Sequence, residues 1–174
     1  MVVPPFGDCA ISVPLSRDLR SNHAGETGAV YIYQGMLKFA TDTEVRAFAQ
    51  AHLATERAHL ELLEAWLPCA LRSALLPLWR LSGWTLGALA ALMGKEAAFA
   101  TVEAVEEFVV AHYQAQIEQT SGGLKTLLQL LQDDEAEHLQ DAARRRDDRP
   151  RWLNAWAWMV RAGSAGAVRL ARLV

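Results

Sequence analysis

Apolar residues recur along most of this chain with the period of an α-helix. Between residues 16 and 40, and again between residues 44 and 67, apolar or small residues return every three or four positions. That spacing places them on one face of a helix with 3.6 residues per turn. No segment of any length alternates every second residue as a strand would, so the pattern predicts an all-α protein.

Short breaks divide this pattern into long helices. Thr41 and Glu44 have the spacing of a capping box at the start of the second helix, and Pro68 ends that helix. The glycines of "TSGG", residues 120–123, end a long third region, and Pro150 begins a fifth helix after a fourth. Long helices joined by short breaks favour a helix bundle.

Length and composition agree with a single domain. The 174 residues suffice for a buried core, and 52% of them are hydrophobic. We expect one domain over residues 1–174, with an N-terminal extension at 1–14 that has neither signal-peptide nor transit-peptide character. Cys9 and Cys69 are the only cysteines and give no disulfide framework, which favours a reducing compartment.

Residues 75–93 form a nearly uncharged run of 19 residues. The run approaches the length needed to cross a bilayer, but it contains Pro77, Gly83, Gly87 and a charge, Arg80, which make a crossing costly. We therefore expect a membrane-interacting segment that lies on the surface or is partly inserted. A buried hairpin is the alternative.

Residues 150–174 have the pattern of an amphipathic helix, with Arg161 and Arg172 roughly opposite an apolar stripe. Residues 144–174 hold 8 Arg and 2 Asp, whereas the preceding part of the chain holds 9 basic and 18 acidic residues. Trp and Arg on such a helix suit a membrane interface, and packing against the bundle is the alternative. Nucleic acid is not expected, because the basic groups belong to an apolar helix. The apolar stripe consists of Trp152, Trp156, Met159, Gly163, Ala167, Leu170 and Val174.

Two helices carry a carboxylate and an imidazole at the same spacing. Glu135 and His138 in "QDDEAEHLQD" are three positions apart, so both side chains reach one point beside the helix. The second helix repeats this pattern with Glu56 and His59. One Glu-x-x-His is usually accidental, but two on different helices form the core of a di-iron carboxylate bundle.

Such a bundle needs one further carboxylate from each of the two remaining helices. Glu26 shares the apolar stripe of the first helix with Val30. On the third helix Glu106 lies on the apolar stripe, whereas Glu107 is turned away by about 100° and is expected in solvent. Glu103 lies nearer the stripe and is a candidate to contact a ligand. The predicted metal ligands are Glu26, Glu56, His59, Glu106, Glu135 and His138.

This donor set suits iron or manganese. Four negative charges would be strongly unfavourable in a core without cations, and two Fe(II) ions would neutralise them. Open coordination positions would then admit dioxygen.

Three other side chains are close to the predicted ligands in sequence. Asp134 would usually be a surface residue, but it directly precedes Glu135 and from there could accept the free ring N–H of His59 across the bundle. His52 lies four residues before Glu56 on the same face, so it either supports a ligand or is buried at a helix contact. We expect His23 to be a hydrogen-bonded core histidine rather than a ligand.

Over roughly residues 17–174 the chain resembles the demethoxyubiquinone hydroxylase family of ubiquinone biosynthesis. The resemblance is carried by "NHAGETGA", "ATERAHL", "DDEAEHL" and the long segment that begins "LLPLWRLSGWTLG". It implies a ferritin-like four-helix di-iron bundle with an added membrane-interacting segment, and the same six ligands.

The resemblance also implies roles for particular residues. Glu56 and Glu135 would be the bridging carboxylates. His112 and Tyr113 would lie between the quinone and the metals.

The activity implied by the resemblance is a monooxygenase reaction. Two iron ions and dioxygen would hydroxylate the ring of a demethoxyubiquinol-type polyprenyl quinol, and the quinol would supply electrons. The absence of a flavin or nicotinamide fingerprint agrees with this. Further expected partners are the membrane surface, a lipid-carrying biosynthetic protein and a second copy of the chain. The protein would be monotopic, on the cytoplasmic face of a bacterial membrane or the matrix face of the mitochondrial inner membrane.

Two other classes of function remain open on the sequence alone. A ferritin-like protein that binds or oxidises iron without a quinone would use the same ligands, although the apolar run at 75–93 argues against a soluble shell. A non-catalytic lipid-binding helical protein would leave four inward carboxylates without a purpose.

Overall fold

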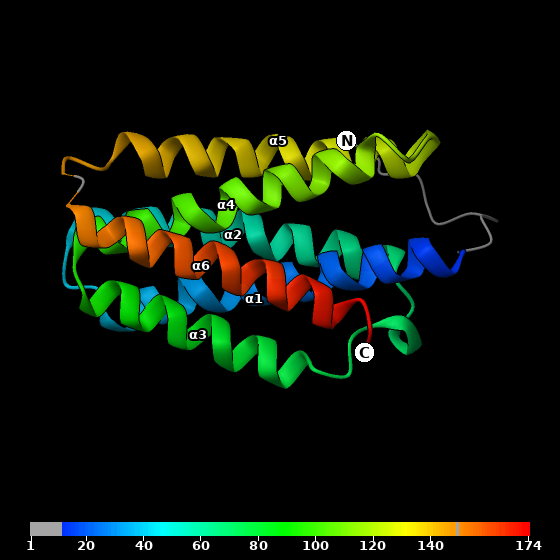
Figure 1. Cartoon of the computed structure of the whole chain (residues 1–174), viewed down its shortest axis with the longest axis horizontal. Coiled ribbons are helices and arrows are strands. Elements are labelled where there is room, and N and C mark those ends of the chain that lie inside the picture. Colours follow the sequence, from blue (N-terminus) through cyan, green and yellow to red (C-terminus); the bar gives the residue numbers. More distant parts are fainter. Residues whose placement is uncertain (1–11, 149) are drawn as a thin grey trace.

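The protein is described by a computed structural model that covers residues 12–148 and 150–174 (Figure 1). All regular structure in these ranges is helical, which confirms the all-α prediction there. The elements are α1 (Val13–Phe39), α2 (Thr43–Trp66), the short 3-10 helix η1 (Cys69–Leu71), α3 (Leu76–Leu92), α4 (Lys95–Ile117), α5 (Gly122–Arg144) and α6 (Arg151–Ala171).

Several predicted helix boundaries need correction. The cap of α2 is Asp42 rather than Thr41, because the Asp42 carboxylate accepts from the backbone N–H groups of Glu44 and Val45 at 2.8 and 3.0 Å. The third predicted region is two helices, separated at Gly94, whose φ of 101° strongly favours glycine. The predicted extension at 1–14 falls mostly outside the described residues, and α1 already begins at Val13.

Helices α1, α2, α4 and α5 form the bundle, and α3 and α6 lie on its outside. In Figure 1 α3 runs along the lower edge beside α1, and α6 crosses in front against α4 and α1. All six predicted ligands come from the four bundle helices, at the middle of each helix.

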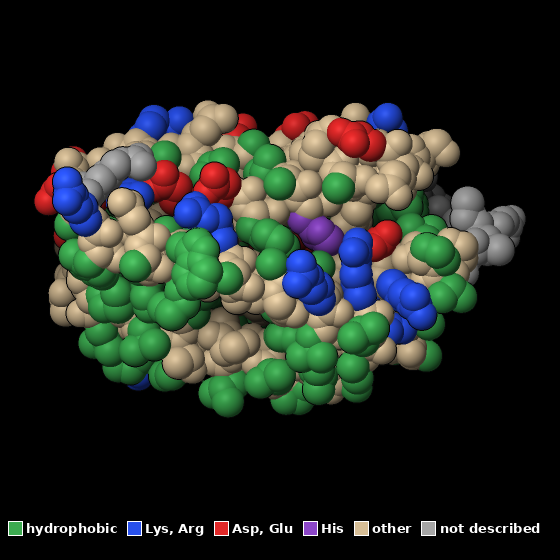
Figure 2. All heavy atoms as spheres, viewed as in Figure 1, with side chains coloured by type: hydrophobic (Ala, Val, Ile, Leu, Met, Phe, Trp, Pro, Cys, Tyr) green, Lys and Arg blue, Asp and Glu red, His purple; other side chains and the backbone are tan. Residues whose placement is uncertain are grey.

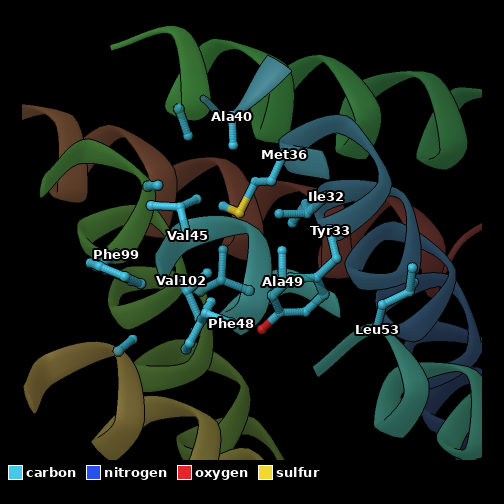
Figure 3. Close-up of a cluster of buried hydrophobic side chains, with 14 of the residues drawn as sticks. Ile32, Tyr33, Met36, Ala40, Val45, Phe48, Ala49, Leu53, Phe99 and Val102 are labelled. Atoms are coloured by element: carbon cyan, nitrogen blue, oxygen red, sulfur yellow. The ribbon is translucent and has the colours of Figure 1, made fainter. Parts of the chain in front are cut away.

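Two apolar clusters fill the bundle on either side of these polar positions. One cluster, drawn in Figure 3, contains Tyr33, Phe48 and Val102. The other contains Leu63 and Leu131. Each bundle helix contributes to both clusters, and its predicted ligands lie between the two contributions along the sequence. The polar residues are therefore enclosed by hydrophobic packing from both ends.

Helix α3 contacts α1 through glycine. A Cβ atom added at Gly87 would lie 1.9 Å from the backbone oxygen of Ile32, and one added at Gly83 would lie 2.3 Å from that of Gly28. The two backbones thus touch directly, as small residues allow. This contact buries one face of α3 and leaves the opposite face, with Leu81 and Leu92, about 63% and 64% exposed. The segment is therefore a half-exposed helix and not a fully buried hairpin.

No helix in the described part of the chain is long and apolar enough to cross a membrane.

Helix α6 packs on the bundle with a face beside the predicted apolar stripe. Leu153, Val160 and Ala171 are buried, whereas Trp152 and Met159 from the predicted stripe are half exposed. Figure 2 shows hydrophobic side chains gathered on the surface over α3 and α6, with basic groups between them. One face of α6 therefore packs on the bundle, while part of the predicted apolar stripe remains exposed to solvent.

The basic C-terminal segment is largely neutralised within the molecule. Arg145 pairs with Glu44 and Asp141, and Arg161 pairs with Glu107. Arg172 likewise contacts a carboxylate of α1. The charge asymmetry of the sequence thus joins α6 and the end of α5 to the bundle, which reduces the free positive charge available for an anionic partner.

The α1–α3 contact predicts opposite effects of alanine at two glycines. Gly87→Ala should lower the free energy of unfolding by roughly 1–3 kcal/mol, because backbone atoms must move to admit the methyl group. Gly163→Ala on α6, where nothing lies within 4 Å of the added atom, should raise it by about 0.4–1 kcal/mol. Thermal unfolding followed by circular dichroism measures both, and equal effects of the two changes would contradict the close contact.

Candidate metal centre

Four bundle helices bring four carboxylates to one buried point. Glu26 on α1, Glu56 on α2, Glu106 on α4 and Glu135 on α5 are all 3% exposed or less. Glu107, the next residue of α4, is exposed and pairs with Arg161, as its helical phase predicted.

The buried carboxylates and histidines form two overlapping groups that could each hold a metal ion. Within each group one candidate ligand atom per residue lies within 4.8 Å of the others. Both groups contain Glu56 and Glu135, which is the arrangement that two bridging carboxylates require. The first group is Glu26, Glu56, His59 and Glu135, and the second is Glu56, Glu106, Glu135 and His138.

The two histidines point the same ring atom at the carboxylates. Nδ1 of His59 lies 3.0 Å from Glu135 Oε1 and 3.5 Å from Glu26 Oε2. Nδ1 of His138 lies 3.0 Å from Glu56 Oε1 and 3.2 Å from Glu135 Oε2. The histidine of α2 thus contacts a carboxylate of α5, and the histidine of α5 contacts a carboxylate of α2.

Several polar atoms at this point are buried without a hydrogen-bond partner. They include both carboxylate oxygens of Glu56, one oxygen each of Glu26 and Glu135, and Nδ1 of His138. Buried acceptors that face one another are unfavourable, and cations between them would satisfy every one. This donor set fits hard or borderline divalent ions such as iron.

Electrostatics at the centre also favours a cation. Burial raises the pKa of Glu56 and Glu106 well above the usual range, and the neighbouring carboxylates add to that effect. Burial alone would lower the pKa of His59, but hydrogen bonds to Glu135 and Glu26 raise it to about 12. The metal-free centre therefore retains protons, which bound metal would displace.

Two tyrosines hold the outer carboxylates in a reciprocal arrangement. The hydroxyl of Tyr113 on α4 donates to Glu26 on α1. The hydroxyl of Tyr33 on α1 lies 3.5 Å from Glu106 on α4 and donates to it. Sequence reasoning assigned no role to Tyr33. The signal was present, because each tyrosine follows the carboxylate of its own helix by seven residues.

Asp134 lies where the sequence analysis expected it. Its Oδ2 is 2.9 Å from Nε2 of His59, on the side of the ring away from the carboxylates. His52 packs its ring on that of His138, with ring centres 4.1 Å apart, and its Nε2 lies 3.1 Å from Asp141. Both side chains therefore touch a candidate ligand, and the side chain of Asp134 also remains 43% exposed.

Two other candidates lie away from the centre. Glu103 accepts a hydrogen bond from Arg146 and belongs to neither group of candidate ligands. His23 is buried with its Nε2 3.4 Å from Glu64, as expected for a core histidine.

A cavity of about 490 Å³ reaches the centre between α1, α3, α4 and α6. Its walls are mostly apolar, and Glu26, Glu106 and Tyr113 line its inner part. His112 also lines it, and Nε2 of His112 lies 2.8 Å from the side-chain amide of Gln116. Burial lowers the pKa of His112 to about 4, so the ring is neutral near pH 7. The cavity is an apolar space with one polar corner beside the buried carboxylates.

Comparison with known proteins gives a consistent set of matches. The family model described as ubiquinone biosynthesis protein COQ7 matches residues 14–171. The chain is 38% identical over 133 residues to the NADPH-dependent 3-demethoxyubiquinone 3-hydroxylase of Mus musculus, covering 71% of this chain and 61% of the relative.

Bacterial and fungal relatives match at similar levels. The 3-demethoxyubiquinol 3-hydroxylase of Rhodospirillum rubrum is 35% identical over 138 residues, covering 76% of this chain and 65% of that protein. The mitochondrial 5-demethoxyubiquinone hydroxylase of Saccharomyces cerevisiae is 32% identical over 160 residues, with coverages of 74% and 64%. The chain thus spans a little less than two thirds of the length of these relatives.

The position of Asp134 predicts a specific effect on metal affinity. Asp134→Ala should weaken metal binding by roughly 10- to 100-fold, because the carboxylate fixes the ring of His59 and its tautomer. Chelator-competition titration measures the affinity. Asp133→Ala, at the exposed neighbouring position, is the control and should bind metal as the unaltered protein does. Equal affinities of the two variants would contradict this role.

Proposed function

Because this chain belongs to the family of the ubiquinone biosynthesis protein COQ7, we propose that it is a di-iron monooxygenase of ubiquinone biosynthesis. It hydroxylates the ring of a demethoxyubiquinol-type polyprenyl quinol with dioxygen. The observation that carries this proposal is the pair of buried ligand groups that share Glu56 and Glu135 at the inner end of an apolar cavity. The fold is in this view a ferritin-like bundle with α3 and α6 added.

The six buried side chains would hold the two irons. His59 and Glu26 belong to one group and His138 and Glu106 to the other, with Glu56 and Glu135 common to both. When bound, the di-iron centre supplies the redox chemistry that activates dioxygen. The protein contributes the positions of the ligands, which Tyr33, Tyr113 and Asp134 fix by hydrogen bonds.

The cavity would bind the quinol ring and exclude water from it. Its apolar walls suit the ring and the start of a polyprenyl tail, and its polar corner offers neutral His112 as a partner for a ring hydroxyl. Tyr113 stands between this corner and Glu26, and burial keeps its pKa well above the usual value, so the hydroxyl retains its proton. His112 and Tyr113 therefore connect the substrate with the metal ligands, on the route that electrons from the quinol would take.

The membrane surface would deliver the substrate. The cavity opens between α3 and α6, whose exposed apolar side chains form one surface (Figure 2). Trp84 and Trp152 lie on this surface, and Trp suits the depth of lipid headgroups. We infer monotopic binding, on the cytoplasmic face of a bacterial membrane or the matrix face of the mitochondrial inner membrane. A lipid-carrying protein or a second copy of the chain would dock on the same surface.

An iron-binding or iron-oxidising protein without a quinone substrate is the alternative function. It would need the metal centre but no apolar cavity beside it. The cavity and its exposed apolar rim therefore favour the hydroxylase.

Genetic replacement tests the activity directly. Cells that lack the protein should accumulate a quinone precursor that lacks a methoxy group, and the unaltered gene should restore the mature quinone. Glu135→Ala should fail to restore it and should lose the roughly two irons per chain, because both groups of ligands lose a member. Glu107→Ala, at an exposed position of α4, is the control and should restore both. Normal iron in the Glu135 variant would contradict the assigned centre.

Exposed leucines of α3 test membrane attachment. Replacing Leu81, Leu89 and Leu92 with Ser should weaken binding to phospholipid vesicles by about two orders of magnitude, at roughly 1 kcal/mol for each partly buried side chain. The iron content should not change, because none of the three lines the cavity.

The matched control replaces three exposed alanines of α2, Ala47, Ala54 and Ala58, with Ser. This variant should co-sediment with vesicles as the unaltered protein does. Equal vesicle binding by the leucine and alanine variants would show that α3 does not face the lipid.

A further inference from the structure

A second cavity, of about 420 Å³, lies on another side of the candidate metal centre. Residues of α2 and α5 alone line it, and none comes from α3 or α6. We call it the polar access cavity. Helix α5, which carries Glu135, contributes both to this cavity and to the metal centre. No residue lines both this cavity and the apolar cavity.

The charged side chains that line the polar access cavity are mostly acidic. Asp134, Glu137 and Asp141 are its carboxylates, and Arg144 is its one cationic side chain. The imidazole of His52 also lines it. Neutral imidazole and carboxylate oxygen are both ligands for divalent first-row metals.

The buried ring of His138 connects this cavity with the centre. His138 lines the cavity although its side chain is only 4% exposed, and its Nδ1 faces Glu56 and Glu135 without a hydrogen bond. Among the described residues, no hydrogen bond or ion pair involves its Nε2. His59 differs, because its Nε2 has a carboxylate partner in Asp134, the residue directly before Glu135. The equivalent residue on α2, directly before Glu56, is Thr55, which has no carboxylate to offer His138.

We propose that the polar access cavity is the route by which divalent iron reaches the metal centre, past His52 and His138. Asp134, Glu137 and Asp141 attract the hydrated cation, although Arg145 already pairs with Oδ1 of Asp141. Nε2 of His52 and Oδ2 of Asp141, 3.1 Å apart, give the cation a first pair of ligand atoms. These carboxylates do not converge into a third group of ligand atoms within 4.8 Å among the described residues. The ion is therefore held briefly and passes on to the oxygens of Glu56 and Glu135 that have no hydrogen-bond partner.

The alternative route is unfavourable for an ion. The walls of the first cavity are mostly apolar outside its one polar corner, so a hydrated cation would lose water there with little compensation. Iron and the apolar substrate would thus reach the centre from different sides. This inference rests on the proposed di-iron function.

The test compares rates of metal uptake with final metal content. Anaerobic Fe(II), or Co(II) followed by its absorbance, is mixed with metal-free protein in a stopped-flow instrument. Glu137→Gln should slow uptake and Arg144→Gln should accelerate it, each by roughly 2- to 5-fold at low ionic strength, because one charge at the mouth is removed. Both effects should shrink in about 0.5 M salt. The final content should stay at that of the unaltered protein.

Two charge-matched controls lie on the same helices outside the cavity. Asp133→Asn on α5 and Arg57→Gln on α2 are exposed and line neither cavity, so their uptake rates should not change. Equal rates for the cavity variants and these controls would overturn the proposed route while leaving the metal centre intact. An unaltered protein that takes up no iron would instead contradict the proposed function.

Discussion

The burial of four carboxylates at one point is the constraint on which the rest of this structure depends. Glu26, Glu56, Glu106 and Glu135 come from four different helices and are almost fully shielded from solvent. Without a cation they repel one another and lose their hydration, so Glu56 and Glu106 retain protons. Bound cations would relieve both the repulsion and the loss of hydration. This is the physical reason to interpret the cluster as a candidate metal centre.

The surrounding fold serves to hold these groups in place. Apolar clusters at both ends of the bundle enclose the polar layer, so the helices cannot shift without losing hydrophobic contacts. Within the layer, Tyr33 and Tyr113 each bridge α1 and α4 by holding the carboxylate of the opposite helix. Asp134 does the same for His59 across α2 and α5. Every hydrogen bond of this kind joins two helices, and the centre is therefore as rigid as the bundle itself.

The added helices divide the molecule into two chemically different sides. α3 and α6 present apolar side chains and frame the apolar cavity, while α2 and α5 present carboxylates around the polar access cavity. An apolar ring and a hydrated cation have opposite requirements for solvation, so a single opening would serve one of them badly. The direct glycine contact between α1 and α3 keeps α3 close enough to form the wall of the first cavity.

Periodicity and spacing alone predicted the all-α class, the six side chains that meet and the contrast between Glu106 and Glu107, because helical phase is a local property of the chain. The position of Asp134 directly before Glu135 suggested a contact with His59, which the structure shows at 2.9 Å. Periodicity and spacing misplaced the cap of α2 and merged α3 with α4, because competing cap residues and a left-handed glycine leave weak local signals. The bonding role of Tyr33, the face of α6 that is buried and the pairing of the C-terminal arginines arise between segments far apart in the sequence. Such contacts depend on how whole helices rotate and pack against one another, and only the tertiary structure decided them.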